Sequence, residues 1–138
     1  MPKNKTNSYR HFKTLIFEKC RGVAWVRLNR PKVRNALNVA MFDELRAAME
    51  EVKRDDEIYA AIITGVGKSF CSGKDLREIK LPVDFDSRRM SAYIAIEKCP
   101  KVVIAAVNGH AVTGGFTVAL CCDLIVAAEN AIFQDTHA

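Results

Sequence analysis

The sequence contains no apolar run near the roughly 18 residues that a membrane-spanning helix needs. Its N-terminal segment also lacks the apolar core of a secretory signal, so we interpret residues 1–13 as a polar, flexible tail. The first acidic residue is Glu18, which leaves an organelle transit peptide as the alternative. We therefore expect one domain over residues 14–138 and no membrane partner.

Paired cysteines with the spacing of metal ligands are missing as well. The five cysteines are an odd number, and the chain has neither a Cys-x-x-Cys motif nor a matching pair of histidines. This usage disfavours a zinc site or a disulfide framework and is typical of reduced, buried thiols. We expect a cytoplasmic protein without a metal, and the mitochondrial matrix is the alternative location.

A concentrated basic patch is also lacking. The formal net charge is +5, but the basic residues are spread along the chain and are not interleaved with aromatic residues. This distribution disfavours nucleic acid as a partner. It suits a small anionic ligand such as a coenzyme, or simply a solvated surface.

Local signals predict alternating strands and helices. Asn38 is a good N-cap, and apolar residues recur on one face of the segment that follows it. The predicted strands cover residues 14–19, 23–28, 58–64, 102–107, 124–128 and 131–133, and the predicted helices cover 39–54, 87–98 and a short segment opened by Gly114-Gly115. Residues 82–86 are predicted to be a turn-rich loop. This order predicts an α/β fold with covered parallel strands.

Two glycine-containing loops, residues 70–76 and 111–117, each follow a predicted buried strand and are each predicted to open a helix. Backbone N–H groups at a helix start have no intrahelical partner and can bind developing negative charge. Taken singly, each loop could equally be a tight turn that leads into a buried helix. Two such loops that converge could offer two N–H donors to one oxygen atom.

Three spaced motifs resemble the crotonase superfamily, which comprises the enoyl-CoA hydratases and isomerases. They are Asn-Arg-Pro-Lys-Val-Arg-Asn-Ala-Leu (29–37), Phe-Cys-Ser-Gly-Lys-Asp-Leu (70–76), and Ala-Val-Asn-Gly-His-Ala-Val-Thr-Gly-Gly (106–115) with Cys-Asp-Leu-Ile-Val-Ala (122–127). The resemblance implies a spiral of ββα units, truncated here before the C-terminal helical part. It also implies a homotrimer or a dimer of trimers for the full-length form.

The resemblance assigns an oxyanion hole and a coenzyme site. The backbone N–H groups of Lys74 and Gly114 would hold the oxygen of a CoA thioester. Contacts to the CoA moiety would come from Lys32, Val33, Lys68, Ser72, Asp75, Leu76 and Arg77. The resemblance implies no cofactor beyond the CoA moiety of an acyl-CoA substrate, and a function in hydration, dehydration or double-bond isomerisation through a thioester enolate.

The chain departs from the family at the acid/base positions. Hydratases of this family use two glutamates, whose places here are taken by Thr117 and His137. A threonine hydroxyl cannot act as a general base near neutral pH, although it can hydrogen-bond a water or a substrate hydroxyl. His137 could move a proton, with an unperturbed pKa of about 6.5, or could be a frayed penultimate residue.

Two alternatives to the hydratase or isomerase function remain open. One is an enzyme similar to naphthoyl-CoA synthase and the ring hydrolases, a branch that also lacks the first glutamate. The other is a catalytically degenerate member that binds acyl-CoA or assembles with a partner. Loss of both glutamates favours the degenerate member, whereas the two intact glycine loops favour an enzyme.

Overall fold

The computed structural model describes residues 7–8 and 12–136. Its larger sheet has the spatial order β1-β2-β3-β4-β5-β7, with the bounds β1 Asn7–Ser8, β2 Leu15–Cys20, β3 Val23–Leu28, β4 Ala60–Gly65, β5 Val102–Val107 and β7 Leu124–Ala127. A separate parallel pair consists of β6 (His110–Val112) and β8 (Ile132–Gln134). The helices are α1 (Val39–Arg54), α2 (Phe85–Glu97), α3 (Gly114–Cys121) and the 3₁₀ turn η1 (Pro31–Val33).

The predicted N-terminal hairpin is confirmed. Strands β2 and β3 pair antiparallel from Leu15↔Leu28 to Cys20↔Val23. The two residues between them, Arg21 and Gly22, both have positive φ values, which match the twist of a two-residue hairpin turn. Part of the predicted flexible tail takes part in this structure, since the backbone of residues 7–8 pairs with β2 as β1.

Helix α1 confirms the helix predicted from its cap and its apolar face. The Asn38 side chain accepts a hydrogen bond from the Met41 N–H at 2.9 Å, and therefore satisfies one of the free donors at the helix start. The predicted face is fully buried, together with one further residue: Met41, Phe42, Leu45, Ala48, Met49 and Val52.

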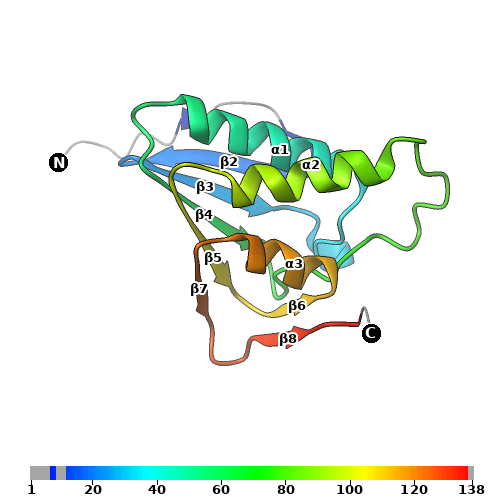
Figure 1. Ribbon diagram of the computed structural model, residues 1–138. Coiled ribbons are helices and arrows are strands. Elements are labelled where there is room, and N and C mark those ends of the chain that lie inside the picture. Colours follow the sequence, from blue (N-terminus) through cyan, green and yellow to red (C-terminus); the bar gives the residue numbers. More distant parts are fainter. Residues whose placement is uncertain (1–6, 9–11, 137–138) are drawn as a thin grey trace.

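Figure 1 shows α1 and α2 side by side along one face of the large sheet, with α3 beside α2 and next to β6. The turn-rich loop is predicted over residues 82–86, but helix α2 already begins at Phe85. The last two residues of the predicted loop are therefore helical. The Phe85 ring is buried against Phe42, with ring centroids 5.9 Å apart. This packing draws Phe85 into the helix although the local sequence is polar.

Strands β3, β4, β5 and β7 are parallel, as predicted, but only one face of the sheet is covered by the described residues. Burial alternates along β3, β4 and β5, as it does in a sheet with one buried and one open face. The prediction of strands covered on both faces is therefore wrong. All four residues of the edge strand β7 are exposed.

Candidate active site

The two glycine loops follow β4 and β5, two adjacent parallel strands, at the edge of the sheet where their carboxyl ends lie. Backbone hydrogen bonds join the loops directly. The Cys71 N–H donates to the His110 oxygen at 3.0 Å, and the Val112 N–H donates to the Cys71 oxygen at 3.0 Å. The loops thus converge, but the prediction that each opens a helix is wrong for the first loop, because the next helix along the chain, α2, begins only at Phe85.

Glycine is required where the loops touch. A Cβ atom on Gly73 would lie 2.2 Å from the Thr113 Oγ1 atom, and a Cβ on Gly115 would lie 2.2 Å from the Cys71 carbonyl oxygen. Gly73 also has a φ of +92°, which side chains other than glycine rarely adopt. Both glycines therefore keep the first loop in contact with the start of α3.

The amides of Lys74 and Gly114 are left available. Leu37 forms an isolated parallel bridge with Lys74, in which its N–H donates to the Gly73 oxygen at 2.8 Å and its carbonyl accepts from the Asp75 N–H at 2.9 Å. In a parallel bridge the N–H of the opposing residue, here Lys74, points away from its partner. Gly114 is the first residue of α3, where an N–H has no intrahelical acceptor. Within the described part of the chain, neither amide donates a hydrogen bond.

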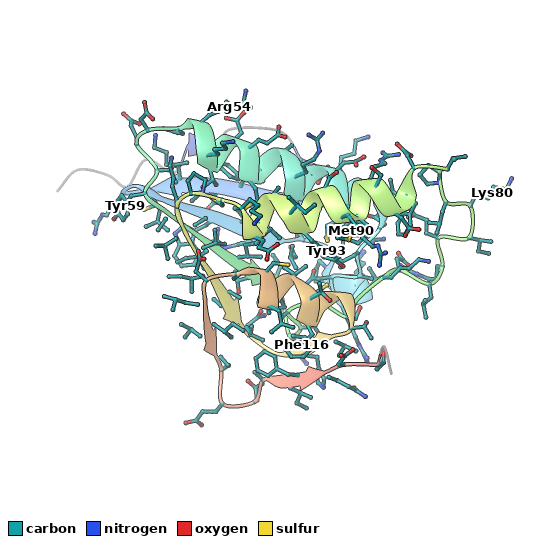
Figure 2. All side chains as sticks on the ribbon, in the orientation of Figure 1. Arg54, Tyr59, Lys80, Met90, Tyr93 and Phe116 are labelled. Carbon is teal, nitrogen blue, oxygen red and sulfur yellow. The ribbon has the colours of Figure 1, made fainter. Side chains whose placement is uncertain are left out.

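A hollow of about 350 Å³ lies between α2 and α3, and Thr117 of the second loop is among its lining residues. Half of the lining residues are polar or charged, namely Arg89, Tyr93, Glu97 and Thr117, and the others are Met90, Ile94, Leu120 and Cys121. Figure 2 shows Tyr93 on the side of α2 that faces α3. The hollow has the size and the mixed lining of a site for a small acyl group.

Thr117, the residue predicted at the place of the first family glutamate, is one of the residues that line this hollow. Its N–H donates to the Thr113 carbonyl at 2.9 Å, and its hydroxyl donates to the same oxygen at 3.2 Å. The hydroxyl keeps its lone pairs and can accept one hydrogen bond from a ligand. His137 lies outside the described residues.

Sequence reasoning missed three polar or charged residues of the hollow, Arg89, Tyr93 and Glu97. Helical periodicity indicates which face of α2 is buried, but it does not identify α3 as the neighbour of that face. Burial raises the pKa of Tyr93 to about 12, so its hydroxyl stays protonated at neutral pH. Glu97 lies one turn further along α2, where burial and, to a lesser extent, the Glu97 charge raise the pKa of the Cys121 thiol.

An aromatic cluster supports this wall of the hollow. The Phe42 ring contacts the Tyr93 ring edge to face, with centroids 5.8 Å apart, and contacts Phe85 in the same way. The Lys74 ammonium lies over the Phe85 ring, 5.2 Å from its centroid. The Lys74 side chain therefore extends toward Phe85, whereas its backbone N–H stays part of the first glycine loop.

Most of the predicted CoA contacts come together on the outer side of the first loop. The Ser72 N–H donates to the Arg34 oxygen at 3.0 Å and the Ser72 hydroxyl lies 3.4 Å from the Val33 oxygen, so this loop adjoins η1 and Lys32. Leu76 is 87% exposed. The first loop and η1 therefore lie next to each other.

Asp75 and Arg77 have a partner within the protein. The buried Asp75 carboxylate accepts hydrogen bonds from Arg77 at 2.9 and 3.0 Å and from Arg30 at 3.0 Å. The Arg77 hydrogen bonds, with a smaller contribution from Arg30, hold the pKa of Asp75 well below its usual range. The Asp75 side chain therefore stabilises the loop.

Lys68 lies elsewhere. It lines a separate hollow of about 450 Å³ with Arg34, Ser69, Gly109, His110 and Asn130. None of the other predicted CoA contacts lines that hollow. Within the described residues, no group of three or more His, Cys, Asp or Glu side chains is placed to hold a metal ion.

The parallel sheet and the two joined loops at its carboxyl edge define an α/β protein with its candidate site at that edge. The chain belongs to the enoyl-CoA hydratase/isomerase family, whose sequence profile matches residues 18–138. The predicted resemblance to the crotonase superfamily is thereby confirmed. None of the described helices is long and apolar enough to cross a membrane.

Individual relatives agree with this assignment. The chain is 40% identical over 119 residues to a protein of Arabidopsis thaliana named probable enoyl-CoA hydratase 1, peroxisomal, an alignment that covers 85% of this chain and 45% of that protein. It is 36% identical over 128 residues to the mitochondrial Delta(3,5)-Delta(2,4)-dienoyl-CoA isomerase of Mus musculus, with 81% and 39% covered.

A solved structure shows the same fold. The enoyl-CoA hydratase/carnithine racemase from Magnetospirillum magneticum matches with a TM-score of 0.88 and 29% identity, over 95% of this chain and 52% of that one. The predicted crotonase-like α/β fold is confirmed by this match. The chain spans about half the length of the relatives it matches.

Proposed function

We propose that this chain binds a CoA thioester and stabilises its enolate with the backbone N–H groups of Lys74 and Gly114. The observation that carries the proposal is the convergence of two free amides at joined loops, the second of which reaches the hollow between α2 and α3 through Thr117. Preorganised amides hold the charge of an enolate oxygen without the reorganisation that water would need. One such donor is worth about 3 kcal/mol in comparable sites.

The coenzyme would lie along the strip formed by η1 and the first loop. Exposed Leu76 offers apolar surface for a planar base, and exposed Lys32 and Arg77 offer positive charge for phosphates. The Arg77 guanidinium is held by Asp75, so its position beside the first loop is fixed. No cofactor beyond the CoA moiety is part of the proposal.

The reaction that fits the family is hydration, dehydration or double-bond isomerisation. In each of them a C–H bond next to the thioester carbonyl breaks or forms, and its electron pair moves onto or off the oxygen that the two amides hold. Thr117 can bind a water or a substrate hydroxyl, but it cannot take the proton. The two-carboxylate hydration mechanism is therefore not part of the proposal, and His137 stays a predicted acid/base residue.

A second candidate function is acyl-CoA binding without turnover. The specific observation in its favour is Thr117, whose hydroxyl is bonded to the Thr113 carbonyl where a family hydratase has a carboxylate. Both candidate functions, the enzyme and the acyl-CoA-binding protein, need the pair of amides. One binding test therefore applies to both, and only the enzyme should convert the bound thioester.

The binding test is Gly114→Ala. Gly114 lacks a positive φ and alanine is favoured in helices, so the variant should fold with a free energy of unfolding within about 1 kcal/mol of the parent. Its new Cβ would lie 3.2 Å from both the Leu37 Cδ1 atom and the Tyr93 hydroxyl, beside the amide. We expect saturable binding of crotonyl-CoA to the parent and at least tenfold weaker binding to the variant.

Coenzyme A without an acyl group is the control ligand. It should bind to the parent chain and to the Gly114→Ala variant with the same affinity. Loss of the conjugated thioester absorbance of crotonyl-CoA identifies turnover, whereas saturable binding without it identifies the second candidate. A parent chain that fails to bind crotonyl-CoA, or a Gly114→Ala variant that binds it equally well, would refute the proposed amide pair.

We also propose a homotrimer or a dimer of trimers for the full-length form, and a cytoplasmic location. The exposed apolar strands β7 and β8 support assembly, since uncovered apolar surface favours association. Cysteine usage supports the location, and all five cysteines are free thiols. Sedimentation of the full-length form and imaging of a tagged protein test these two points.

A further inference from the structure

We infer that the Tyr93 hydroxyl is a third hydrogen-bond donor to the acyl oxygen, beside the amides of Lys74 and Gly114. The inference rests on the proposed function and adds a side-chain donor from a helix that neither glycine loop belongs to. It begins with the position of the hydroxyl. A Cβ atom built on Gly114 would lie 3.2 Å from the Tyr93 oxygen and 3.5 Å from the Gly73 Cα atom.

The same point thus touches all three parts of the site. Gly73 immediately precedes Lys74, one amide donor, and Gly114 is the other. The Tyr93 oxygen lies so close to the Gly114 backbone that an added Cβ would make a tight contact with it. A ligand atom that accepts from the hydroxyl would therefore also lie near the start of α3.

The Tyr93 side chain is largely buried, and its hydroxyl has no protein partner. Tyr93 is 8% exposed, and its oxygen makes no hydrogen bond with any of the residues that the structure describes. The oxygen atom itself is not among the fully buried unpaired atoms, so it is accessible from outside the protein and free to donate to a ligand. Tyr93 lines the hollow with Thr117, so a ligand there would provide the missing acceptor.

The ring is fixed, and the proton is available. Edge-to-face packing against Phe42 restricts the ring, and burial keeps the phenol protonated at neutral pH. The groups that act on it are the Arg89 charge, which lowers its pKa, and the Cys71 and Cys121 thiols, which raise it. Tyr93 can therefore donate a hydrogen bond to an enolate oxygen and is unsuited to act as a base.

The test is Tyr93→Phe with acetoacetyl-CoA as the probe, because its enolate absorbs light and carries negative charge on the acyl oxygens. We expect the variant to bind acetoacetyl-CoA at least tenfold more weakly and to show less enolate absorbance at saturation, since hydrogen bonds to charged groups are strong. Binding of coenzyme A should stay within about twofold. The phenylalanine ring retains the contact with Phe42, so the melting temperature should change little.

Tyr59→Phe is the matched control. Tyr59 is 66% exposed, and its hydroxyl donates to the Arg21 oxygen at the hairpin, at the other end of the sheet in Figure 2. Acetoacetyl-CoA bound equally well by the Tyr93→Phe variant and the parent would overturn the assignment of Tyr93 alone. A parent chain that binds neither acetoacetyl-CoA nor crotonyl-CoA would overturn the proposed function and the assignment with it.

Discussion

Thr113, the residue before Gly114, has a backbone conformation that β-branched residues rarely adopt. Its φ and ψ are 47° and −110°, and such conformations cost on the order of 1–3 kcal/mol. Its N–H donates to the Gln134 oxygen at 2.8 Å, and its carbonyl accepts from the Thr117 N–H. Backbone hydrogen bonds on both sides of Thr113 therefore hold its strained conformation. This conformation sets the direction of the Gly114 N–H.

The contact between Gly73 and Thr113 leads to a prediction for Gly73→Ala. The new Cβ would meet the Thr113 Oγ1 atom at 2.2 Å and the Val112 oxygen at 2.9 Å, at a φ of +92°. We expect a loss of about 3 kcal/mol or more in the free energy of unfolding, measured by urea denaturation.

Gly67→Ala separates the steric clash from the cost of the positive φ, the two causes of the loss expected for Gly73→Ala. Gly67 has a similar φ of +86°, but its Cβ would have only the Pro31 Cβ atom, at 3.3 Å, as a near neighbour. We expect a loss of about 1 kcal/mol from the backbone conformation alone. Equal losses at the two positions would show that the loop contact contributes nothing.

At the scale of the elements, local signals predicted those parts that local interactions fix. The Arg21-Gly22 turn, the Asn38 cap and the apolar run of β5 are each encoded within a few residues, and the structure has them at the predicted places. Strand β6 was missed because its three residues pair with β8, about 20 residues away, and continue the contact with Cys71. Non-local pairing of this kind leaves no periodic pattern in so short a segment.

The candidate site likewise has parts that local sequence reveals and parts that depend on how distant elements pack. The glycine loops could be found from sequence because they need glycine at fixed positions, whereas the role of Tyr93 depends on how α2 packs against α3. The expectation that both faces of the sheet are covered failed for a related reason. Apolar runs in β4 and β5 do not reveal which neighbours cover each face.

Asp75 joins the segment before η1 to the first glycine loop, and this link predicts a pH dependence. Its pKa is lowered in the folded state, so its contribution to stability is present above the unfolded pKa of about 4 and is lost as the pH falls below it. We expect Asp75→Asn to cost about 1–2 kcal/mol at neutral pH, because two arginines lose a charged acceptor. Urea denaturation over a pH series should show this difference shrinking below about pH 4.

Asp86→Asn is the control for that series. Asp86 pairs with Arg89, the two side chains are 82% and 37% exposed, and ion pairs with this exposure contribute little. Its substitution should change the free energy of unfolding by less than about 0.5 kcal/mol. A difference for Asp75→Asn that stays constant down to low pH would contradict the link between its charge and the loop.

At the scale of the whole molecule, the described residues build one well-packed side and leave one side open. Helices α1 and α2 cover the sheet on one face, and the buried residues form a single cluster beneath them (Figure 1). Strand β7 ends the large sheet with an unpaired edge, and its apolar side chains are exposed together with those of β8. Both the proposed acyl site and this open surface involve the segment from β5 to β8.

An unpaired edge with apolar side chains should make the chain associate with itself. Val126, in the middle of β7, is 62% exposed, so Val126→Lys should lower the weight-average mass in sedimentation without a loss of stability above about 0.5 kcal/mol. Val83→Lys makes the same substitution at an exposed position in the loop before α2, away from the large sheet. If this control lowers the mass equally, added charge and not the edge of β7 governs association, because only Val126 belongs to a strand that can pair.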